Sequence, residues 1–148
     1  MEMTKTKTTA AICAQAIRAE LKKAFPNVKF SVKSSNFSMG NSVDIKYVDG
    51  PARKDVEAIT NKYQYGHFDG MIDCYEHSNT RDDLPAQAKW VMVNREFSVE
   101  TSKKLMLKLA EKYGIAPQED LSKSFDLNGD YTNFAQLIWR EYNETEVV

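Results

Sequence analysis

The spacing of apolar residues changes at Pro26 and Asn27, from the period of a helix to that of a strand. Before this point, apolar residues between Thr9 and Phe25 recur three and four positions apart, which predicts an amphipathic helix. Proline disfavours helical geometry in the residue before it, so the helix should end here. Residues 28–33 then alternate strictly between apolar and polar, which is typical of a half-buried strand. The chain is therefore restricted to folds that combine helices with a sheet.

Three more predicted strands and a helix follow. Residues 43–47 alternate again, which predicts a strand that pairs with the first in an antiparallel hairpin with a long connection. Residues 51–65 predict a second helix with proline in its first turn. Residues 70–78 have a weak strand pattern, whereas residues 89–97 are rich in β-branched and aromatic residues and apolar on both faces. We therefore expect the last of these strands to lie in the centre of the sheet.

The C-terminal part of the chain predicts two further helices. Ser98 is a suitable N-cap for a helix that ends before Gly114 and turns Val99 toward the core. Residues 117–125 predict one short helical turn, and turn residues then lead into a last helix that carries Phe134 on its apolar side. We predict an α+β fold in the order α-β-β-α-β-β-α-α, with a mostly antiparallel sheet of about four strands covered by helices.

Length and composition predict one domain. The 148 residues, 42% hydrophobic and 28% charged, match the size and composition of a globular domain rather than a disordered chain. We expect a single domain over residues 1–148, with flexible ends at residues 1–8 and 144–148. The 20 basic and 21 acidic side chains nearly cancel, so overall charge does not draw the protein onto DNA or an anionic membrane.

Cysteine content and hydropathy favour a cytoplasmic protein. Cys13 and Cys74 are too few for a fold held by disulfides, and Cys13 falls on the apolar side of the first predicted helix. The N-terminal residues lack the apolar segment of a secretion signal. No apolar stretch approaches the roughly 18 residues that a membrane span requires.

The motifs that mark common enzymes and cofactor sites are missing from the sequence. Gly66 and Gly70 lack the GxGxxG spacing, no GxxxxGK[ST] loop occurs, and no serine lies in a GxSxG turn. With two histidines, no catalytic triad is indicated. We therefore predict a protein that is not an enzyme and that takes no cofactor.

A metal site would have to use the segment from His67 to His77. Five possible ligands lie within it: His67, Asp69, Asp73, Cys74 and His77. A lone Cys-x-x-His lacks the second ligand pair of a zinc site, and in a strand Cys74 and His77 point to opposite faces. We predict no metal and expect surface histidines beside a buried thiol. A metal-assisted hydrolase centred on His67 and His77 is kept as a further hypothesis, after the two functional hypotheses given below.

A first candidate interaction surface extends from Tyr63 to Arg81. Aromatic side chains alternate there with polar ones, a combination that is typical of binding hot spots and of platforms that stack bases. The alternative is that half of these rings fill the core around an irregular loop. The predicted binding residues are Tyr63, Tyr65, His67, Asp69, Asp73, Tyr75, His77 and Arg81.

A second candidate surface is a basic face of the first helix and the adjacent strand. Its possible nucleic-acid contacts are Arg18, Lys22, Lys29 and Lys33. The alternative is an ordinary solvated helix face, since Glu20 borders the patch.

Residues 16–79 resemble a known family in four places: KKAFP, KFSVKSS, SVDIKYVDGP and AITNKYQYGHFDGMIDCYEHSN. In these pieces the chain is similar to the large polyvalent protein associated domain family, in its class twenty-nine, and AKWVMVNREFS continues the likeness. The resemblance implies an origin in phages or conjugative elements, where such domains occur alone or within very long proteins delivered with invading DNA. It also implies a role against host defences, and it defines no catalytic residues.

Two functional hypotheses follow. The first is a non-enzymatic protein-interaction module of a phage or mobile genetic element, which binds a host or element-encoded protein through the segment from Tyr63 to Arg81. The alternative is a nucleic-acid-binding module that uses the basic helix face together with the aromatic loop.

Overall fold

The computed structural model describes residues 8–147, and the chain groups into two compact units. One unit combines Met1–Tyr47 with Lys54–Asn94, and the other combines Val48–Arg53 with Arg95–Val148. The single domain expected over residues 1–148 stays a prediction. Of the ends expected to be flexible, residues 1–7 and 148 lie outside the described residues, whereas Val147 pairs with Gly50 in a β-bridge.

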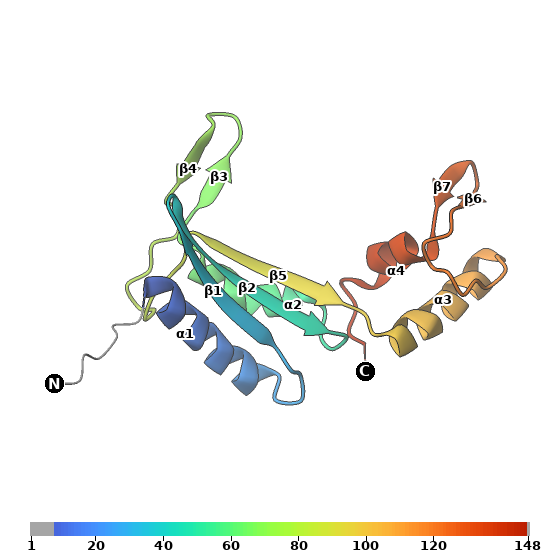
Figure 1. Cartoon of the computed structure of the whole chain (residues 1–148), viewed down its shortest axis with the longest axis horizontal. Coiled ribbons are helices and arrows are strands. Elements are labelled where there is room, and N and C mark those ends of the chain that lie inside the picture. The colour runs from blue at the N-terminus through green and yellow to red at the C-terminus, as the bar shows by residue number, and fades with distance from the viewer. Residues whose placement is uncertain (1–7, 148) are drawn as a thin grey trace. The chain divides into compact units, whose positions relative to one another are not determined.

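The sheet of the first unit has three strands in the order β1-β2-β5: β1 (Ser31–Phe37), β2 (Gly40–Val48) and β5 (Trp90–Glu96) (Figure 1). β1 and β2 are antiparallel, whereas β2 and β5 run in the same direction. This direction follows from the long crossover between them, which contains a helix. The α+β class is confirmed, but the sheet of about four strands is not, and the central strand is β2 rather than β5.

The connection between β1 and β2 is short. Phe37 pairs with Gly40, so only Ser38 and Met39 form the turn, and the long loop expected here is wrong. Gly40 has φ of 152°, and a side chain at this position would place its Cβ 2.6 Å from Cδ of Lys89. Glycine thus lets β2 start directly after the turn, close to the residue that precedes β5.

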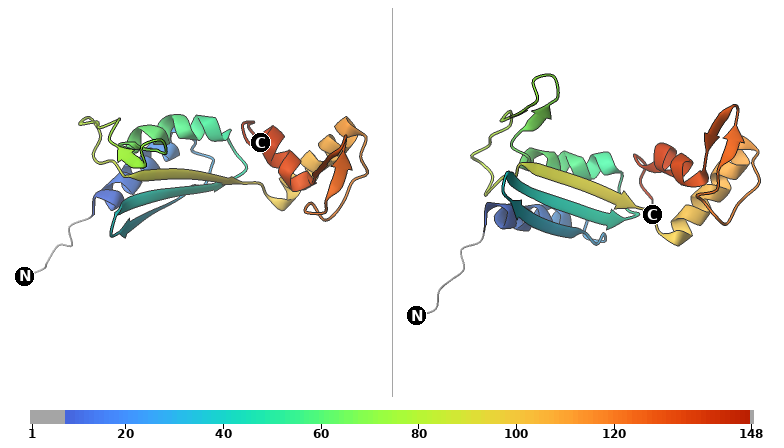
Figure 2. Two further views of the ribbon diagram at one scale, coloured as in Figure 1. Left: turned by 90° about the horizontal axis from the view of Figure 1, so that it is seen from above. Right: turned by 45° about the horizontal axis from the view of Figure 1, so that its top comes forward.

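Two helices, α1 (Thr9–Ala24) and α2 (Arg53–Thr60), lie on the same face of this sheet, and a 3₁₀ turn (Asn61–Tyr63) continues α2 (Figure 2). Thr8 caps α1 by accepting a hydrogen bond from the Ala11 amide. The first core consists of these buried residues: Cys13, Ala14, Ile17, Leu21, Val32, Val43, Ile45, Tyr47, Val56, Tyr63, Ala88 and Val91. Burial raises the pKa of the Cys13 thiol to about 11, so the thiol stays protonated and packs as a hydrophobe.

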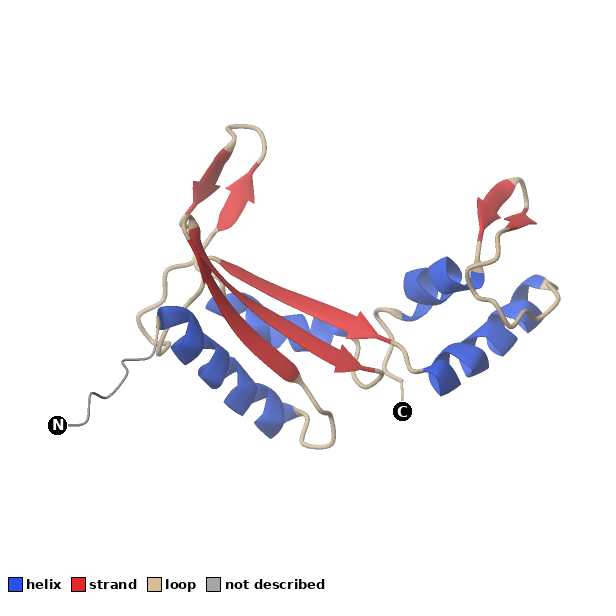
Figure 3. Cartoon of the chain, viewed as in Figure 1, coloured by secondary structure: helices blue, strands red, loops and turns tan. Residues whose placement is uncertain are grey.

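A small hairpin interrupts the crossover from α2 to β5. Its strands are β3 (His67–Asp69) and β4 (Cys74–Glu76), which pair with each other and not with the main sheet (Figure 3). The weak strand expected over residues 70–78 is thus present only in its second half, because residues 70–73 form the turn.

The second unit contains α3 (Val99–Tyr113), the hairpin of β6 (Phe125–Leu127) and β7 (Asp130–Thr132), and α4 (Phe134–Tyr142). Ser98 caps α3 and Gly114 ends it in the left-handed conformation, as the sequence predicts. The hairpin was not expected, and residues 117–125 contain no helix. The second core consists of Leu105, Met106, Leu109, Ala110, Phe134, Leu137 and Ile138.

Two residues expected in the core are on the surface. Val99 is 86% exposed because it occupies the first turn of α3, where the helix has not yet met its packing partner. Ala24, at the end of α1, is also exposed. Helices lose their packing neighbours at their ends, so the apolar period alone overestimates burial there. Within residues 8–147, none of the helices has the length and apolarity needed to cross a membrane.

Candidate functional site

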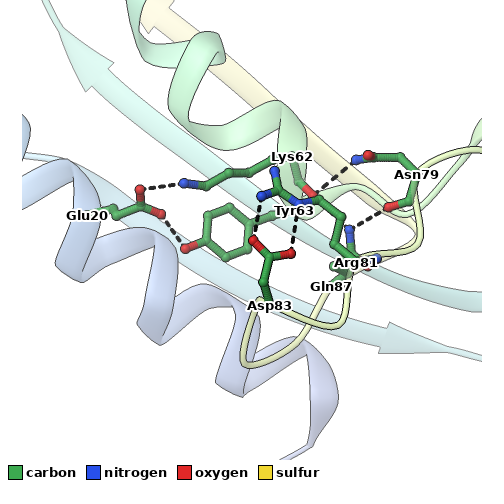
Figure 4. Close-up of polar contacts among 7 residues, drawn as sticks. All are labelled: Glu20, Lys62, Tyr63, Asn79, Arg81, Asp83 and Gln87. Carbon is green, nitrogen blue, oxygen red and sulfur yellow. Dashed lines mark hydrogen bonds and ion pairs between the residues drawn. The ribbon is translucent and has the colours of Figure 1, made fainter.

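Tyr63 fixes the start of the crossover between α2 and β5 to α1. This side chain is 3% exposed, and its hydroxyl donates a hydrogen bond to the Glu20 carboxylate, which also pairs with Lys62 at 2.6 Å (Figure 4). Burial, and then the hydrogen bond with Glu20, raise the pKa of Tyr63. Burial alone would raise the pKa of Glu20, but the hydrogen bonds from Lys62 and Tyr63 outweigh it and lower that pKa. Tyr63 is therefore buried at the contact with α1 and supports the fold.

A second set of polar contacts holds the segment that follows the hairpin (Figure 4). The Asn79 side-chain amide donates to the carbonyl oxygens of Lys62 and Gln64 at 3.2 and 3.1 Å. The Gln87 side-chain amide donates to those of Lys62 and Asn79 at 2.7 and 2.8 Å. Its Oε1 accepts from the Arg81 amide at 2.9 Å. The side chains of Asn79 and Gln87 thus hold in place a connection that has no regular secondary structure.

Arg81 is exposed and forms an ion pair with Asp83 on the same loop. The guanidinium donates two hydrogen bonds to this carboxylate, at 3.0 and 2.5 Å. The hydrogen bond with Asp83 is the main cause of the raised pKa of Arg81. A surface pair of this kind orders the loop locally and adds little to stability.

Four rings pack together at the base of the hairpin, and we call them the ring cluster: Tyr65, Tyr75, His77 and Trp90. Tyr65 stacks on His77 with 4.8 Å between ring centroids and an interplanar angle of 4°. Tyr75 meets the other three rings edge to face at centroid distances of 5.8, 5.7 and 5.2 Å. Edge-to-face and offset contacts are the favoured geometries of aromatic pairs. The four rings therefore pack against one another, with Tyr65, Tyr75 and Trp90 partly buried and His77 exposed.

Tyr75 is the centre of the ring cluster. Its hydroxyl donates to the Lys89 carbonyl at 2.6 Å, and the Lys89 ammonium lies 5.0 Å from its ring centroid. Burial, and then the charge of Tyr65, raise the pKa of Tyr75. These contacts connect β4 to the start of β5, so the hairpin is attached to the main sheet through side chains as well as through the chain.

Gly66 makes the close approach of β4 possible. A Cβ at this position would lie 2.0 Å from the Glu76 carbonyl oxygen and 2.5 Å from Cε1 of Tyr75. No side chain fits there, so the requirement for glycine is spatial rather than conformational.

Three apolar side chains of the hairpin are exposed, Phe68 on β3 and Met71 and Ile72 on the turn, and we call them the hairpin tip. Their exposed fractions are 50%, 96% and 58%. Asp69 Oδ1 accepts from the Met71 amide at 2.9 Å, and Asp73 has φ of 51°, so the turn has a defined shape. The residue pattern predicts a strand that includes Met71 and Ile72, whereas both lie in the turn. The Asp-Gly step before them, a common turn signal, could have indicated that they are exposed.

The remaining predicted binding residues are on the surface of the hairpin. His67 Nδ1 lies 2.8 Å from Oγ of Ser78, and its Nε2 lies 3.7 Å from the Glu76 carboxylate. Asp69 and Asp73 shape the turn. The binding role of all eight residues stays a prediction, but the structure brings Tyr65, Tyr75 and His77 together and separates them from Tyr63.

The possible metal ligands do not converge. Among the residues that the structure describes, no group of three or more His, Cys, Asp or Glu side chains could hold a metal ion. The His77 ring is stacked on Tyr65, and Cys74 is exposed. The buried thiol expected here is therefore wrong: in a hairpin that stands apart from the main sheet, β4 has no core to face.

The predicted nucleic-acid contacts lie along α1 and β1. Arg18 donates to the Val32 carbonyl at 2.7 Å, and Lys22, Lys29 and Lys33 are exposed. Glu20, which was expected to border this patch, is turned toward Lys62 instead. Contact with nucleic acid stays a prediction for these four residues.

Comparison with known families gives a match to large polyvalent protein associated domain 29 over residues 8–106. The chain belongs to this family. The match spans the main sheet, the ring cluster and the hairpin tip, and it ends within α3. The family description associates the domain with large polyvalent proteins, and thereby with phages and mobile genetic elements. Neither the curated proteins nor the solved structures contain a significant match to the chain.

Proposed function

We propose that this chain is a non-enzymatic protein-interaction module of a phage or mobile genetic element, and that it binds a host or element-encoded protein through the hairpin tip. We also propose that this binding counteracts a host defence. The observation that carries it is the exposure of three apolar side chains close together in the sequence, Phe68 on β3 and Met71 and Ile72 on the turn that follows it.

Exposed apolar side chains that occur together on a soluble protein favour a binding role. Single exposed apolar residues are ordinary, but a cluster on a projecting turn is characteristic of interaction sites. Met71 is almost fully exposed, and methionine adapts its shape to a partner more readily than branched residues do. Phe68 can fill a pocket of the partner as an anchor.

The ring cluster supports the proposal by holding the hairpin in a defined shape. A preformed binding loop loses less conformational entropy when it binds than a flexible one does. Tyr65, Tyr75 and His77 provide this support through contacts with each other and with Trp90. We assign these rings a positioning role and the hairpin tip the contact role.

The nucleic-acid alternative has weaker support. A base-stacking platform needs free ring faces, whereas Tyr65 and His77 cover one face of each other and Tyr75 is enclosed by edges. A titration of the protein with a 20-nucleotide single strand and a 20-base-pair duplex, at low and then increasing salt, tests the alternative directly. Binding that weakens steeply with salt would favour it over the protein-interaction proposal.

The test of the proposal compares three forms of the full chain in affinity capture from host-cell lysate. The first is the unchanged protein, and the second is the combined variant Phe68→Ser, Met71→Ser and Ile72→Ser. The third is a matched control, Val99→Ser and Tyr131→Ser, which removes two side chains that are 86% and 83% exposed but lie outside the hairpin.

We expect the unchanged protein and the control to capture the same partner, and the hairpin-tip variant to lose it. Titration calorimetry with the purified partner should then give a dissociation constant at least about tenfold higher for the hairpin-tip variant, which corresponds to about 1.4 kcal/mol. Equal affinity of all three forms would reject the hairpin tip as the binding surface.

A further inference from the structure

Within residues 8–147, the outer edge of β1 has backbone groups without hydrogen-bond partners. In the pairing of β1 with β2, Ser31, Lys33, Ser35 and Phe37 lie opposite even-numbered residues of β2. The odd-numbered side of the β2 backbone faces β5, as the hydrogen bond from the Asp49 amide to the Glu96 carbonyl indicates. Because backbone groups of a strand alternate between its two neighbours, Val32, Ser34 and Asn36 of β1 direct theirs outward.

One of these groups is occupied and the others are not. The Val32 carbonyl accepts a hydrogen bond from the Arg18 guanidinium at 2.7 Å. Among residues 8–147, the outward amide and carbonyl groups of Ser34 and Asn36 have no hydrogen-bond partner. β1 is exposed at every residue except Val32. Natural proteins usually protect such an edge, because it can pair with another strand.

Two adjoining hollows lie along α1 and β1, and both include Arg18. One has a volume of about 520 Å³ and lies between α1 and the first half of β1, where Val32, Lys33 and Ser34 line it. The other has a volume of about 380 Å³ and is lined by the end of α1 and the segment that leads into β1, with Lys22 and Lys29. Together they form a depression beside the free edge.

The charge of this depression has one sign. Arg18, Lys22, Lys29 and Lys33 line it, and none of the described lining residues is acidic. Asp44 lies opposite Lys33 on β2, so it offsets part of the charge of that lysine. Glu20 does not offset the rest, because its carboxylate is bound to Lys62 and Tyr63 on the other side of α1.

We propose that the free edge of β1 is a docking site for an extended acidic peptide segment of another protein. The segment adds a strand to the sheet by pairing with the backbone of Ser34 and Asn36. Its acidic side chains, which recur every second residue at about 6.5 Å, lie over the basic depression. An extended peptide fits these observations better than nucleic acid does, because its backbone offers a regular row of donors and acceptors that matches the outward amide and carbonyl groups.

This site is separate from the hairpin tip, so the two proposals are tested independently. The probe is the blocked nine-residue peptide EVEVEVEVE, titrated into the isotope-labelled full chain and followed by NMR. A peptide with lysine in place of each glutamate has the same strand pattern and the opposite charge. An acidic peptide with proline at its second and third valines has the charge but cannot pair as a strand.

We expect the glutamate-valine peptide alone to shift the amide signals of residues 32–37 and to slow hydrogen exchange of the Ser34 and Asn36 amides at least tenfold. Equal binding of the lysine peptide or of the proline-containing peptide would overturn the proposal. The absence of binding by all three peptides would also overturn it. So would a result in which the Ser34 and Asn36 amides are already protected in the protein alone because it self-associates, which sedimentation detects.

Two variants locate the site. Ser34→Pro removes an outward amide without removing a hydrogen bond between β1 and β2. This change should raise the dissociation constant of the glutamate-valine peptide at least tenfold. The combined change Lys22→Glu and Lys29→Glu should do the same, whereas the control Lys104→Glu and Lys108→Glu on α3 should not. The amide spectrum shows whether each variant is folded. If Ser34→Pro does not fold, the peptide affinity of the Lys22→Glu and Lys29→Glu variant tests the proposal. A 20-nucleotide single strand that shifts the same residues while the peptide does not would assign the depression to nucleic acid and overturn the proposal.

Discussion

At the scale of single residues, roles in the first unit are set by contacts between distant parts of the chain. Glu20 would be an ordinary surface carboxylate of α1 if Lys62 and Tyr63, more than 40 positions later, did not bind it. Gly66 would be an ordinary loop glycine if the Glu76 carbonyl did not occupy the space of its missing side chain. Both residues hold the segment that carries the ring cluster and the hairpin tip.

Replacing Glu20 should make stability less dependent on acid pH. The pKa of Glu20 in the folded protein lies below its ordinary value of 4.5, so the ionised carboxylate favours the folded state. Its contribution is present above the ordinary pKa and is lost as pH falls through the folded pKa. The carboxylate is partly exposed, so Glu20→Gln should lower the free energy of unfolding by only about 1 kcal/mol at pH 7.

The measurement for Glu20→Gln is urea unfolding at pH 7 and in steps below pH 5. The difference between the variant and the unchanged protein should shrink toward the acid end. Glu111→Gln, at an exposed position of α3, serves as the control and should have almost no effect. A difference that is constant with pH would contradict the assigned role of the carboxylate.

Gly66→Ala should disrupt the base of the hairpin, whereas Gly70→Ala in its turn should not. The added methyl group at position 66 meets a backbone carbonyl, but no atom lies within 4 Å of the corresponding position at Gly70. Overpacking of this kind costs about 1–3 kcal/mol, which lowers the melting temperature by roughly 2–10 °C in a chain of this length. Calorimetry of both variants checks this, and similar melting temperatures would argue against the tight approach.

At the scale of elements, Arg95 connects three segments of the second unit. Its side chain is 3% exposed, and its guanidinium donates to the carbonyl oxygens of Asp49 and Gly50 at 3.2 and 3.0 Å. It also donates to those of Tyr142 and Asn143, at 3.1 and 2.7 Å. The end of β5, the turn after β2 and the end of α4 therefore share one hydrogen-bonding centre.

Arg95→Met should destabilise the second unit by about 3 kcal/mol or more, because four hydrogen bonds from its guanidinium to buried and partly buried carbonyl groups are lost at once. The exposed Arg140→Met on α4 is the matched control and should change stability by less than about 0.5 kcal/mol. Urea unfolding followed by the fluorescence of Trp139, in a Trp90→Phe background, measures both. Equal effects of the two changes would show that the contacts of Arg95 do not matter for stability.

At the scale of the whole molecule, the two compact units have separate cores but continuous strands. The boundaries between the units fall within β2 and β5, and the short segment Val48–Arg53 belongs with the C-terminal part of the chain. Each unit contains one tryptophan, Trp90 in the first and Trp139 in the second. The fluorescence of each therefore reports on one unit.

We expect the two units to unfold together, as the single domain predicted from the sequence requires. The variants Trp90→Phe and Trp139→Phe each leave one reporter, and their urea midpoints should coincide. Leu109→Ala in the second core should lower both midpoints equally, at a cost of about 2–5 kcal/mol. If only the Trp139 signal responds to this change, the units are separate domains.

The sequence by itself determined the elements with a strong local period or clear end signals. The apolar spacing of α1, the alternation in β2, and the end signals of α3 at Ser98 and Gly114 all depend on residues within a few positions of each other. The alternation at residues 28–33 overlaps β1 (Ser31–Phe37) only in part, because the pairing with β2 extends the strand through residues expected in the loop. The aromatic segment was also recognised as the unusual part of the chain, and the family match covers it.

Only the tertiary structure decided which strand is central and which aromatic residues are on the surface. β5 is apolar enough for a central strand, but the crossover through α2 places it at the edge, beside β2. Three-residue strands such as β3 and β4 are too short to show a period, so the alternation of residues does not reveal the hairpin, and the Asp69-Gly70 step is the one local signal of its turn. Tyr63 and Tyr65 are the same residue type two positions apart, but the first is buried by contacts with α1 and the second stacks on His77. Contacts between residues so far apart in the chain leave no local signal in the sequence.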